Sequence, residues 1–191
     1  MRQITASTVM EIEQMGLVKK ALDGDVDAYG QLYALYLDRI YRYVFYQVRD
    51  EMKAQDITQE VFIKAWKAIK SCGGKESSFS AWLYRIAHNH TVDVLRKTHP
   101  EVHLETAALN GTEDIEQNAE LASEKQAILK MVSDLPDQQR QIILLKFLEG
   151  YDNQEIQQIT GKRQGAIRAI QMRALNTLRQ RLGVEVNGFE S

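Results

Sequence analysis

The sequence predicts an all-α protein, made of two small helical domains that a flexible acidic linker joins. Only two prolines and eleven glycines occur among its 191 residues, so few positions interrupt a helix. Apolar residues recur at three- and four-residue spacing through most of the chain. Charge divides the chain into a basic part over 1–97 (net +2), an acidic part over 98–124 (net −7) and a basic part over 125–191 (net +3).

Composition narrows the classes of function. The single cysteine, Cys72, excludes an internal disulfide framework, and no His or Cys set has the spacing of a zinc site. No signal segment begins the chain, and no run of about 18 apolar residues could span a bilayer. We therefore expect a cytoplasmic protein without metal, cofactor, membrane insertion or enzyme chemistry, since no constellation suggests a nucleophile.

The predicted N-terminal domain covers 16–97 and follows an uninterpreted extension over 1–15. A helix over about 16–22 ends at Asp23-Gly24-Asp25, and a second helix over about 29–46 carries a tyrosine-rich stripe. Tyrosines could stack on bases, but we expect their rings in the core with the hydroxyls at its edge. The stripe consists of Tyr29, Leu32, Tyr33, Tyr36, Ile40, Tyr43, Val44 and Tyr46.

The next helix, over 56–66, has two faces. Asp56, Gln59 and Glu60 lie at positions i, i+3 and i+4, so they share a polar face. Spacing alone leaves two interpretations, a solvated face or a docking patch for a basic partner helix, and favours the solvated face. The opposite apolar stripe consists of Ile57, Val61, Phe62, Ala65 and Trp66.

A polar loop over 70–78 precedes a helix over 79–97, and this loop lacks the residue order of a nucleotide-binding loop. His88 and His90, two residues apart, point in different directions, which disfavours a metal site. The predicted inner side has Trp82, Leu83, Ile86, Ala87, Val94 and Leu95. The predicted outer side has Arg85, His88, Asn89, Arg96 and Lys97, side chains that suit phosphate oxygens and base edges.

The predicted C-terminal domain covers 125–184, before a short tail over 185–191. Pro136 suits the first position of a helix that runs to Leu148, in which we expect Ile142, Ile143, Leu145 and Phe147 to be buried. Asn153 is the expected cap of a short helix over 154–160, and Gly161 breaks the chain. The last helix, over 164–182, has Ile167, Ile170, Ala174, Leu175, Leu178 and Leu182 on its apolar face.

A helix, a short turn and a second helix make a helix-turn-helix pattern, and here the second helix is cationic. From Ile156 to Val184 there is no Asp or Glu, and the cations are Lys162, Arg163, Arg168, Arg173, Arg179 and Arg181. A basic amphipathic helix also suits a membrane surface, but this one has no Trp or Phe on its apolar face. We therefore expect this helix to bind DNA.

The two halves together resemble a bacterial RNA polymerase sigma factor of the extracytoplasmic-function (group 4) type of the sigma-70 family. Residues 56–66 resemble the polymerase-docking helix, and 79–97 resemble the helix that reads the -10 element. Residues 135–150 resemble the start of the sigma-4 domain, and 155–182 resemble the helix-turn-helix that reads the -35 element. A match to both halves in the right order is more specific to this family than a match to either half alone.

The resemblance implies partners and site residues. Asp56, Gln59 and Glu60 match positions that contact the clamp helices of the polymerase β′ subunit, and the β flap is a second implied contact. The loop 70–78 matches the segment that captures a base flipped out of the DNA. The implied -10 contacts are Lys75, Ser77, Ser78, Arg85, His88, Asn89, Arg96 and Lys97. The implied -35 contacts are Lys162, Arg163, Gln164, Arg168, Gln171 and Arg173.

Two residues depart from the family pattern. Arg163 stands where Ser or Thr commonly caps the recognition helix, and an arginine cannot accept the backbone N–H bonds. Either Thr160 or water replaces that cap, or Arg163 contacts phosphate. Lys162 occupies a position that is often apolar in members of this family. A lysine there indicates that contacts to phosphate make up a larger share of the binding to the -35 element.

The expected function is initiation of transcription: the protein binds core RNA polymerase and directs it to promoter DNA with specific -10 and -35 elements. An anti-sigma factor is common in the family and is a further expected partner. The alternative is a helix-turn-helix regulator that binds operator DNA without polymerase. This alternative predicts that substitutions at Asp56, Gln59 and Glu60 are tolerated.

Overall fold

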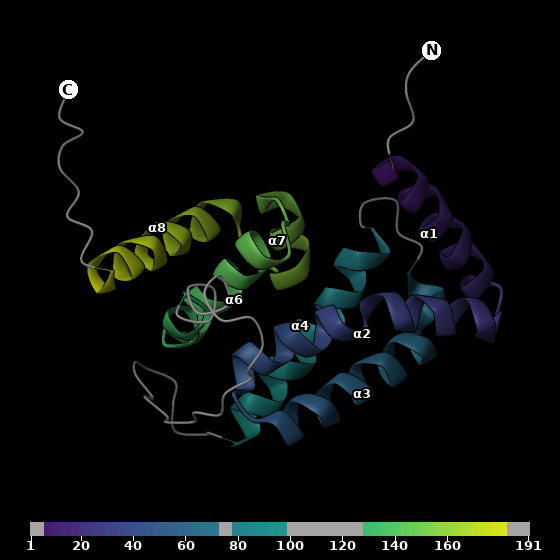
Figure 1. The fold of residues 1–191 in the computed structure, drawn as a ribbon, viewed down its shortest axis with the longest axis horizontal. Coiled ribbons are helices and arrows are strands. Elements are labelled where there is room, and N and C mark those ends of the chain that lie inside the picture. Colours follow the sequence, from purple (N-terminus) through teal and green to yellow (C-terminus); the bar gives the residue numbers. More distant parts are fainter. Residues whose placement is uncertain (1–5, 73–77, 99–127, 183–191) are drawn as a thin grey trace, which may run out of the picture.

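The computed structural model describes residues 6–72, 78–98 and 128–182 (Figure 1). These residues form helices and no strand, which confirms the predicted all-helical class. A 3-10 turn (Ile69–Ser71) follows α3, and 128–133 are helical before α6. The helices are α1 (Ala6–Leu22), α2 (Val26–Val48), α3 (Glu51–Ala68), α4 (Phe79–Thr98), α6 (Asp137–Ile143), α7 (Asn153–Thr160) and α8 (Gln164–Arg181).

In the first domain, α1 to α4 pack around one core. Asp25 and Asp50 begin α2 and α3, because their carboxylates accept the N–H of Ala28 and Lys53, each at 3.0 Å. The first helix starts at Ala6, well before the predicted start at Gly16. The fully buried side chains of this core include Leu32, Ile40, Tyr43, Val44, Val61, Leu83 and Tyr84.

The tyrosines of α2 lie mainly in this core, as expected. Tyr43 is fully buried, and its ring meets the ring of Tyr84 edge-on at 5.3 Å between centroids. Tyr29 is half-buried and donates its hydroxyl to the carbonyl oxygen of Phe62 at 2.6 Å. Among the tyrosines of α2 only Tyr33 is exposed, so this helix offers no continuous aromatic platform for bases.

The C-terminal helices start and turn differently from the prediction. Pro136 is the N-cap of α6 and not its first residue. The α-helix ends at Ile143, where a π-helical turn over Leu144–Leu148 begins. This wider turn changes the register: Leu144 and Leu145 are buried, whereas Phe147 is 61% exposed, so its predicted burial is wrong.

Two further local predictions are corrected. Asp152, and not Asn153, caps α7 in a reciprocal capping box with Glu155. Leu182, predicted on the apolar face of α8, is 53% exposed because it lies past the end of that helix. The predicted break at Gly161 is confirmed, since this glycine has a left-handed backbone with φ of +71°.

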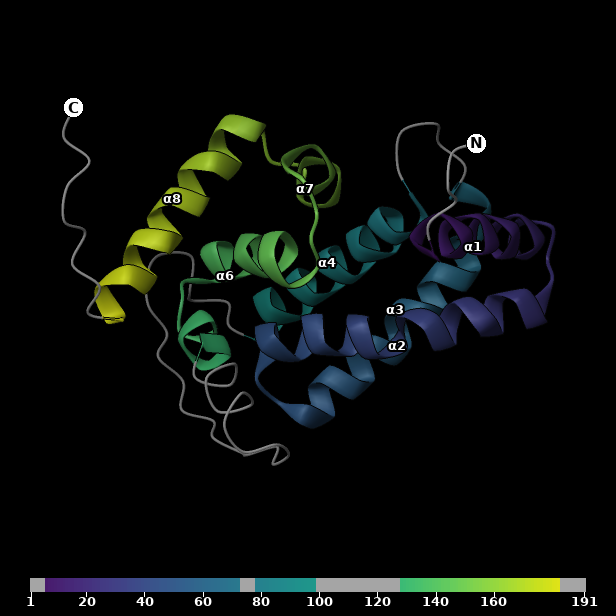
Figure 2. The same ribbon diagram turned by 45° about the horizontal axis from the view of Figure 1, so that its top comes forward.

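The two domains pack against each other. In Figures 1 and 2, α8 lies on the far side of α6 and α7 from α1, α2 and α3. Helix α7 packs on α4, and α6 contacts α2. Helix α8 therefore faces outward, while its neighbour α7 packs on α4, the helix that the resemblance assigns to the -10 element.

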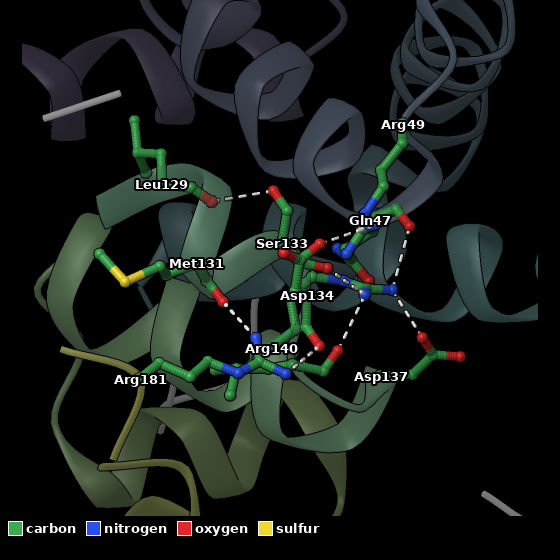
Figure 3. Close-up of polar contacts among 10 residues, drawn as sticks. Gln47, Arg49, Leu129, Met131, Ser133, Asp134, Asp137, Arg140 and Arg181 are labelled. Carbon is green, nitrogen blue, oxygen red and sulfur yellow. Dashed lines mark hydrogen bonds and ion pairs between the residues drawn. The ribbon is translucent and has the colours of Figure 1, made fainter. Parts of the chain in front are cut away.

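Arg140 donates to four acceptor residues at this boundary, Ser133, Leu135, Asp137 and Gln47 (Figure 3). Its side chain is only 8% exposed, and the guanidinium donates to the carbonyl oxygens of Ser133 and Leu135 at 2.9 and 3.1 Å. It also donates to the carboxylate of Asp137 at 2.6 Å and to the carbonyl oxygen of Gln47 in α2 at 3.1 Å. A charge buried this deeply is stable only with such a set of acceptors.

We predict that Arg140→Ala lowers the free energy of unfolding by about 3 kcal/mol, because buried carbonyl oxygens lose their donors. Urea denaturation followed by circular dichroism measures the change. The matched control is Arg42→Ala, an exposed arginine of α2, which should stay within about 0.5 kcal/mol of the unmodified protein. Equal stability of the two variants would contradict the role assigned to Arg140.

Candidate nucleic-acid interface

The helix-turn-helix is built on a small isoleucine core. Ile156 and Ile159 of α7 and Ile167 of α8 are almost fully buried, and Ile170 and Ala174 continue that face of α8. Burial of one face of α8 leaves the opposite face in solvent. Arg163, Arg168 and Arg173 are exposed there, and Lys162, Gln164 and Gln171 are half-exposed. These six residues are the predicted -35 contacts.

The first turn of α8 has no side-chain cap. Arg163 occupies the N-cap position with extended backbone and makes no capping hydrogen bond. Thr160 does not replace it, because its hydroxyl donates to the carbonyl oxygen of Ile156 and accepts the N–H of Lys162 within the turn. The first N–H groups of α8 therefore have no side-chain acceptor, and the exposed Arg163 lies beside them, an arrangement that suits an anion.

Several polar side chains in and at the end of α8 make hydrogen bonds inside the domain. Gln171 donates its amide to Asn153 at 2.9 Å, so it joins the two helices of the motif. Arg181 donates to the carbonyl oxygens of Met131 and Asp134, both at 3.3 Å (Figure 3). These bonds join the end of α8 to the end of the helical segment 128–133. Arg173 donates from Nε to the carbonyl oxygen of Ala169 in its own helix.

An apolar hollow of about 410 Å³ lies along the same outer side of α8. Met172, which is 67% exposed, and Leu175 form its apolar part. Arg168 and Arg179 flank them, and no acid lines the hollow. The outer side of α8 thus combines positive charge with apolar contact area.

Helix α4 presents a second polar face. Arg85, Asn89, Arg96 and Lys97 are exposed, as predicted for -10 contacts, and Arg96 pairs with Asp93 at 3.1 Å. Ser78 is exposed and its hydroxyl accepts the N–H of Ala81 at the start of the helix. The predicted contacts Lys75 and Ser77 lie outside the described residues.

His88 does not lie on the exposed face where the sequence placed it. It is 7% exposed, and its Nδ1 lies 3.3 Å from the hydroxyl of Tyr43. Burial, together with the nearby charge of Lys162, lowers the pKa of His88 to about 4. The sequence prediction fails because α4 is covered on two sides, by α2 and α3 and by α7, which widens its buried face.

The polar face of α3 lies where the sequence placed it, with Asp56, Gln59 and Glu60 all exposed. Glu60 also has a partner that sequence reasoning missed. Its Oε2 lies 2.7 Å from Nε2 of His90, and Lys64 donates to Nδ1 of the same imidazole at 2.6 Å. Since an ammonium group only donates, Nδ1 is the acceptor in the contact with Lys64. His90 therefore links this face to α4.

The described residues hold no group of three or more His, Cys, Asp or Glu side chains that could bind a metal ion. Within the same residues, every helix is too short or too polar to cross a membrane. The surfaces on α3, α4 and α8 offer charge, amide groups and apolar area, which suit macromolecular partners.

Two family models match the chain in order. Sigma-70 region 2 matches residues 32–100, and sigma-70 region 4 matches residues 125–178. The chain is 30% identical to the extracytoplasmic-function RNA polymerase sigma factor SigW of Bacillus subtilis over 91% of its own length and 98% of that protein. The chain belongs to the extracytoplasmic-function group of the sigma-70 family.

Other comparisons agree with this assignment. The sigma factor is 34% identical over 86% of its length to BldN of Streptomyces coelicolor, and it spans 64% of the length of that relative. It also resembles the sigma factor RpoE of Bartonella quintana, solved in complex with the anti-sigma factor NepR. That match has a TM-score of 0.64 and 25% identity, and covers 84% of this chain and 99% of that one.

We predict that the stability of this sigma factor depends on His88 between pH 6.5 and about 4. The folded protein resists protonation of His88, whereas the unfolded chain binds the proton near pH 6.5. Stability is therefore fully present above pH 6.5 and falls with the pH, by on the order of 3 kcal/mol in total.

Urea denaturation of the unmodified protein and His88→Gln at several pH values measures this effect. Glutamine stays polar but does not titrate, so its curve should lack the His88 contribution. The same pH dependence in both proteins would show that His88 is not held neutral by burial.

Proposed function

We propose that this protein is the promoter-recognition subunit of RNA polymerase at a subset of promoters. The observation that carries this proposal is the order of two parts on one chain, a region 2 domain with an exposed polar face on α4 and a region 4 domain with a cationic α8. The protein would bind DNA and help open it, and would do no covalent chemistry.

Helix α8 is the proposed reader of the -35 element in the major groove. Arg168 and Arg163 are exposed and can contact phosphate oxygens or the O6 and N7 atoms of guanine. Gln171 is less available for bases because Asn153 already accepts its amide. Lys162, Gln164 and Arg173 remain proposed contacts at the rim of the same surface.

Helix α4 and the loop before it are the proposed site for the -10 element. Arg85, Asn89, Arg96 and Lys97 supply donors on the exposed face, and Ser78 begins the helix. Capture of a flipped base by Lys75, Ser77 and Ser78 remains part of the proposal. The cost of unstacking that base, a few kcal/mol, must be offset by binding to the polymerase.

The exposed face of α3 is the proposed docking site for the clamp helices of the polymerase β′ subunit. Asp56, Gln59 and Glu60 supply acid and amide groups for a basic helix, and His90 fixes the carboxylate of Glu60. The region 4 domain would bind the β flap. We also propose an anti-sigma factor as a regulator, by analogy with the Bartonella quintana complex.

Run-off transcription with purified core polymerase on a library of genomic promoter fragments tests this function. A sigma factor should give discrete transcripts that neither the core polymerase nor this protein gives alone. The rival, a free-standing operator-binding regulator, predicts tight DNA binding without polymerase and no such transcripts. Absence of stimulation on every fragment would refute the proposal.

We predict that Asp56→Ala combined with Glu60→Ala weakens binding to core polymerase by about tenfold or more, because two charged contacts to a basic partner are lost. Fluorescence anisotropy of the labelled protein measures the affinity. Glu51→Ala removes an exposed acid from the first turn of the same helix and serves as the control. Equal affinities of the two variants would place the docking site elsewhere.

A further inference from the structure

The polar face of α3 has a cluster of three charged or titratable side chains at its edge. Glu60 and Lys64 lie four residues apart on α3, and both contact His90 of α4. Oε2 of Glu60 lies 2.7 Å from Nε2 of the imidazole, and Nζ of Lys64 donates to Nδ1 at 2.6 Å. The two side chains of α3 therefore contact different nitrogen atoms of one ring.

The three side chains differ in their exposure to solvent. The side chain of His90 is 9% exposed, whereas that of Glu60 is 59% exposed and Lys64 is also exposed. The packing of α4 on α3 thus holds the ring, and the carboxylate and the ammonium group reach it from the solvent side. A carboxylate held in this way has less conformational freedom to lose when a partner binds it.

Glu60 and Lys64 have the spacing of a direct ion pair. An acid followed by a lysine four residues later is the favoured order for such a pair on a helix surface. Within the described part of α3 and α4, however, the two side chains form no ion pair with each other and both meet His90. The imidazole therefore separates the carboxylate from the ammonium group.

This separation affects the face that the clamp helices of the polymerase β′ subunit are proposed to bind. A carboxylate that pairs with a neighbouring lysine offers less negative charge to a basic partner. The basic partner would also meet the positive charge of that lysine, and like charges across an interface disfavour binding. With the ring in place, the carboxylate of Glu60 stays available beside the exposed Asp56 and Gln59.

We propose that His90 is a positioning residue for polymerase binding, because its imidazole keeps the carboxylate of Glu60 apart from Lys64 and available to a basic partner helix. This role rests on the proposed function, in which α3 docks on polymerase. His90 itself would not contact polymerase, since its ring is buried between α3 and α4. Its effect on binding would pass through Glu60.

A purely structural role for His90 is the alternative. A buried ring can serve only to fill the space between two packed helices. In that case, a substitution of His90 would lower the affinity for polymerase, if at all, by disturbing the fold, and the loss would not depend on Lys64. The two roles therefore differ in the expected effect of removing Lys64.

Substitutions at His90 and Lys64 distinguish these roles, with fluorescence anisotropy of the labelled full-length protein measuring its affinity for core polymerase. His90→Leu offers neither polar contact, so that Lys64 becomes free to pair with Glu60. We expect it to weaken binding about threefold, close to the loss from Glu60→Ala alone. Adding Lys64→Ala to His90→Leu should restore the affinity to within about 1.5-fold of the unmodified protein, because the carboxylate then has no competing cation.

Lys67→Ala added to His90→Leu is the matched control. Lys67 is another exposed lysine of α3, seven residues after Glu60, so its removal changes the net charge equally but removes no partner at i+4. This control should leave the threefold loss in place. His90→Gln should keep the affinity, because its amide can both donate and accept. Urea denaturation reports whether each variant folds, and His90→Ala replaces His90→Leu if leucine prevents folding.

The outcomes separate this role of His90 from the proposed function. Unchanged affinity of folded His90→Leu would overturn the inference. A loss that Lys64→Ala does not restore, that Lys67→Ala restores equally, or that His90→Gln shares in full would also overturn it. Full affinity of Glu60→Ala would overturn the docking site and the inference together, whereas run-off transcription with the unmodified protein still tests the proposed function by itself.

Discussion

Two charged side chains of the C-terminal domain lie out of water, and each finds part of its compensation in the N-terminal domain. Glu149 accepts from Arg39, and Arg140 donates to the carbonyl oxygen of Gln47. Because a buried charge without partners costs several kcal/mol, these two contacts restrict how the domains can pack. The position of α7 on α4, and the outward direction of α8, follow from that restriction.

The surfaces left exposed by this packing differ in charge and in hydrogen-bonding groups. The outer side of α8 has cations and no acid, the outer side of α4 has donors, and the face of α3 has acids. The two proposed DNA-binding surfaces lie on separate domains, and each alone would bind weakly and in a salt-sensitive way, because the proposed contacts are largely to phosphate. Binding to polymerase would place both surfaces on one DNA molecule. It would thereby raise the effective concentration of each surface at its own DNA element.

Helix content, helix order and most exposed site residues could be predicted from the sequence, because they depend on local periodicity and on breakers such as Gly161. Phe147 was predicted wrongly because a π-helical turn changes the register within an apparently regular helix. The exposure of His88 was predicted wrongly because α2, α3 and α7 all pack on α4 and widen its buried face. The pairs Arg39–Glu149 and His90–Glu60 have no signal in spacing, since their partners come from different helices.

Site-specific photocross-linking to promoter DNA tests most directly whether this one chain contacts two distant promoter elements. A photoreactive residue replaces Asn89 on α4 in one variant and Arg163 at the start of α8 in another, and each is assembled with core polymerase on the same promoter. Cross-links are expected at two positions about 25 base pairs apart, and both should depend on polymerase. Cross-links from both variants at one adjacent site, or the same pattern without polymerase, would contradict it.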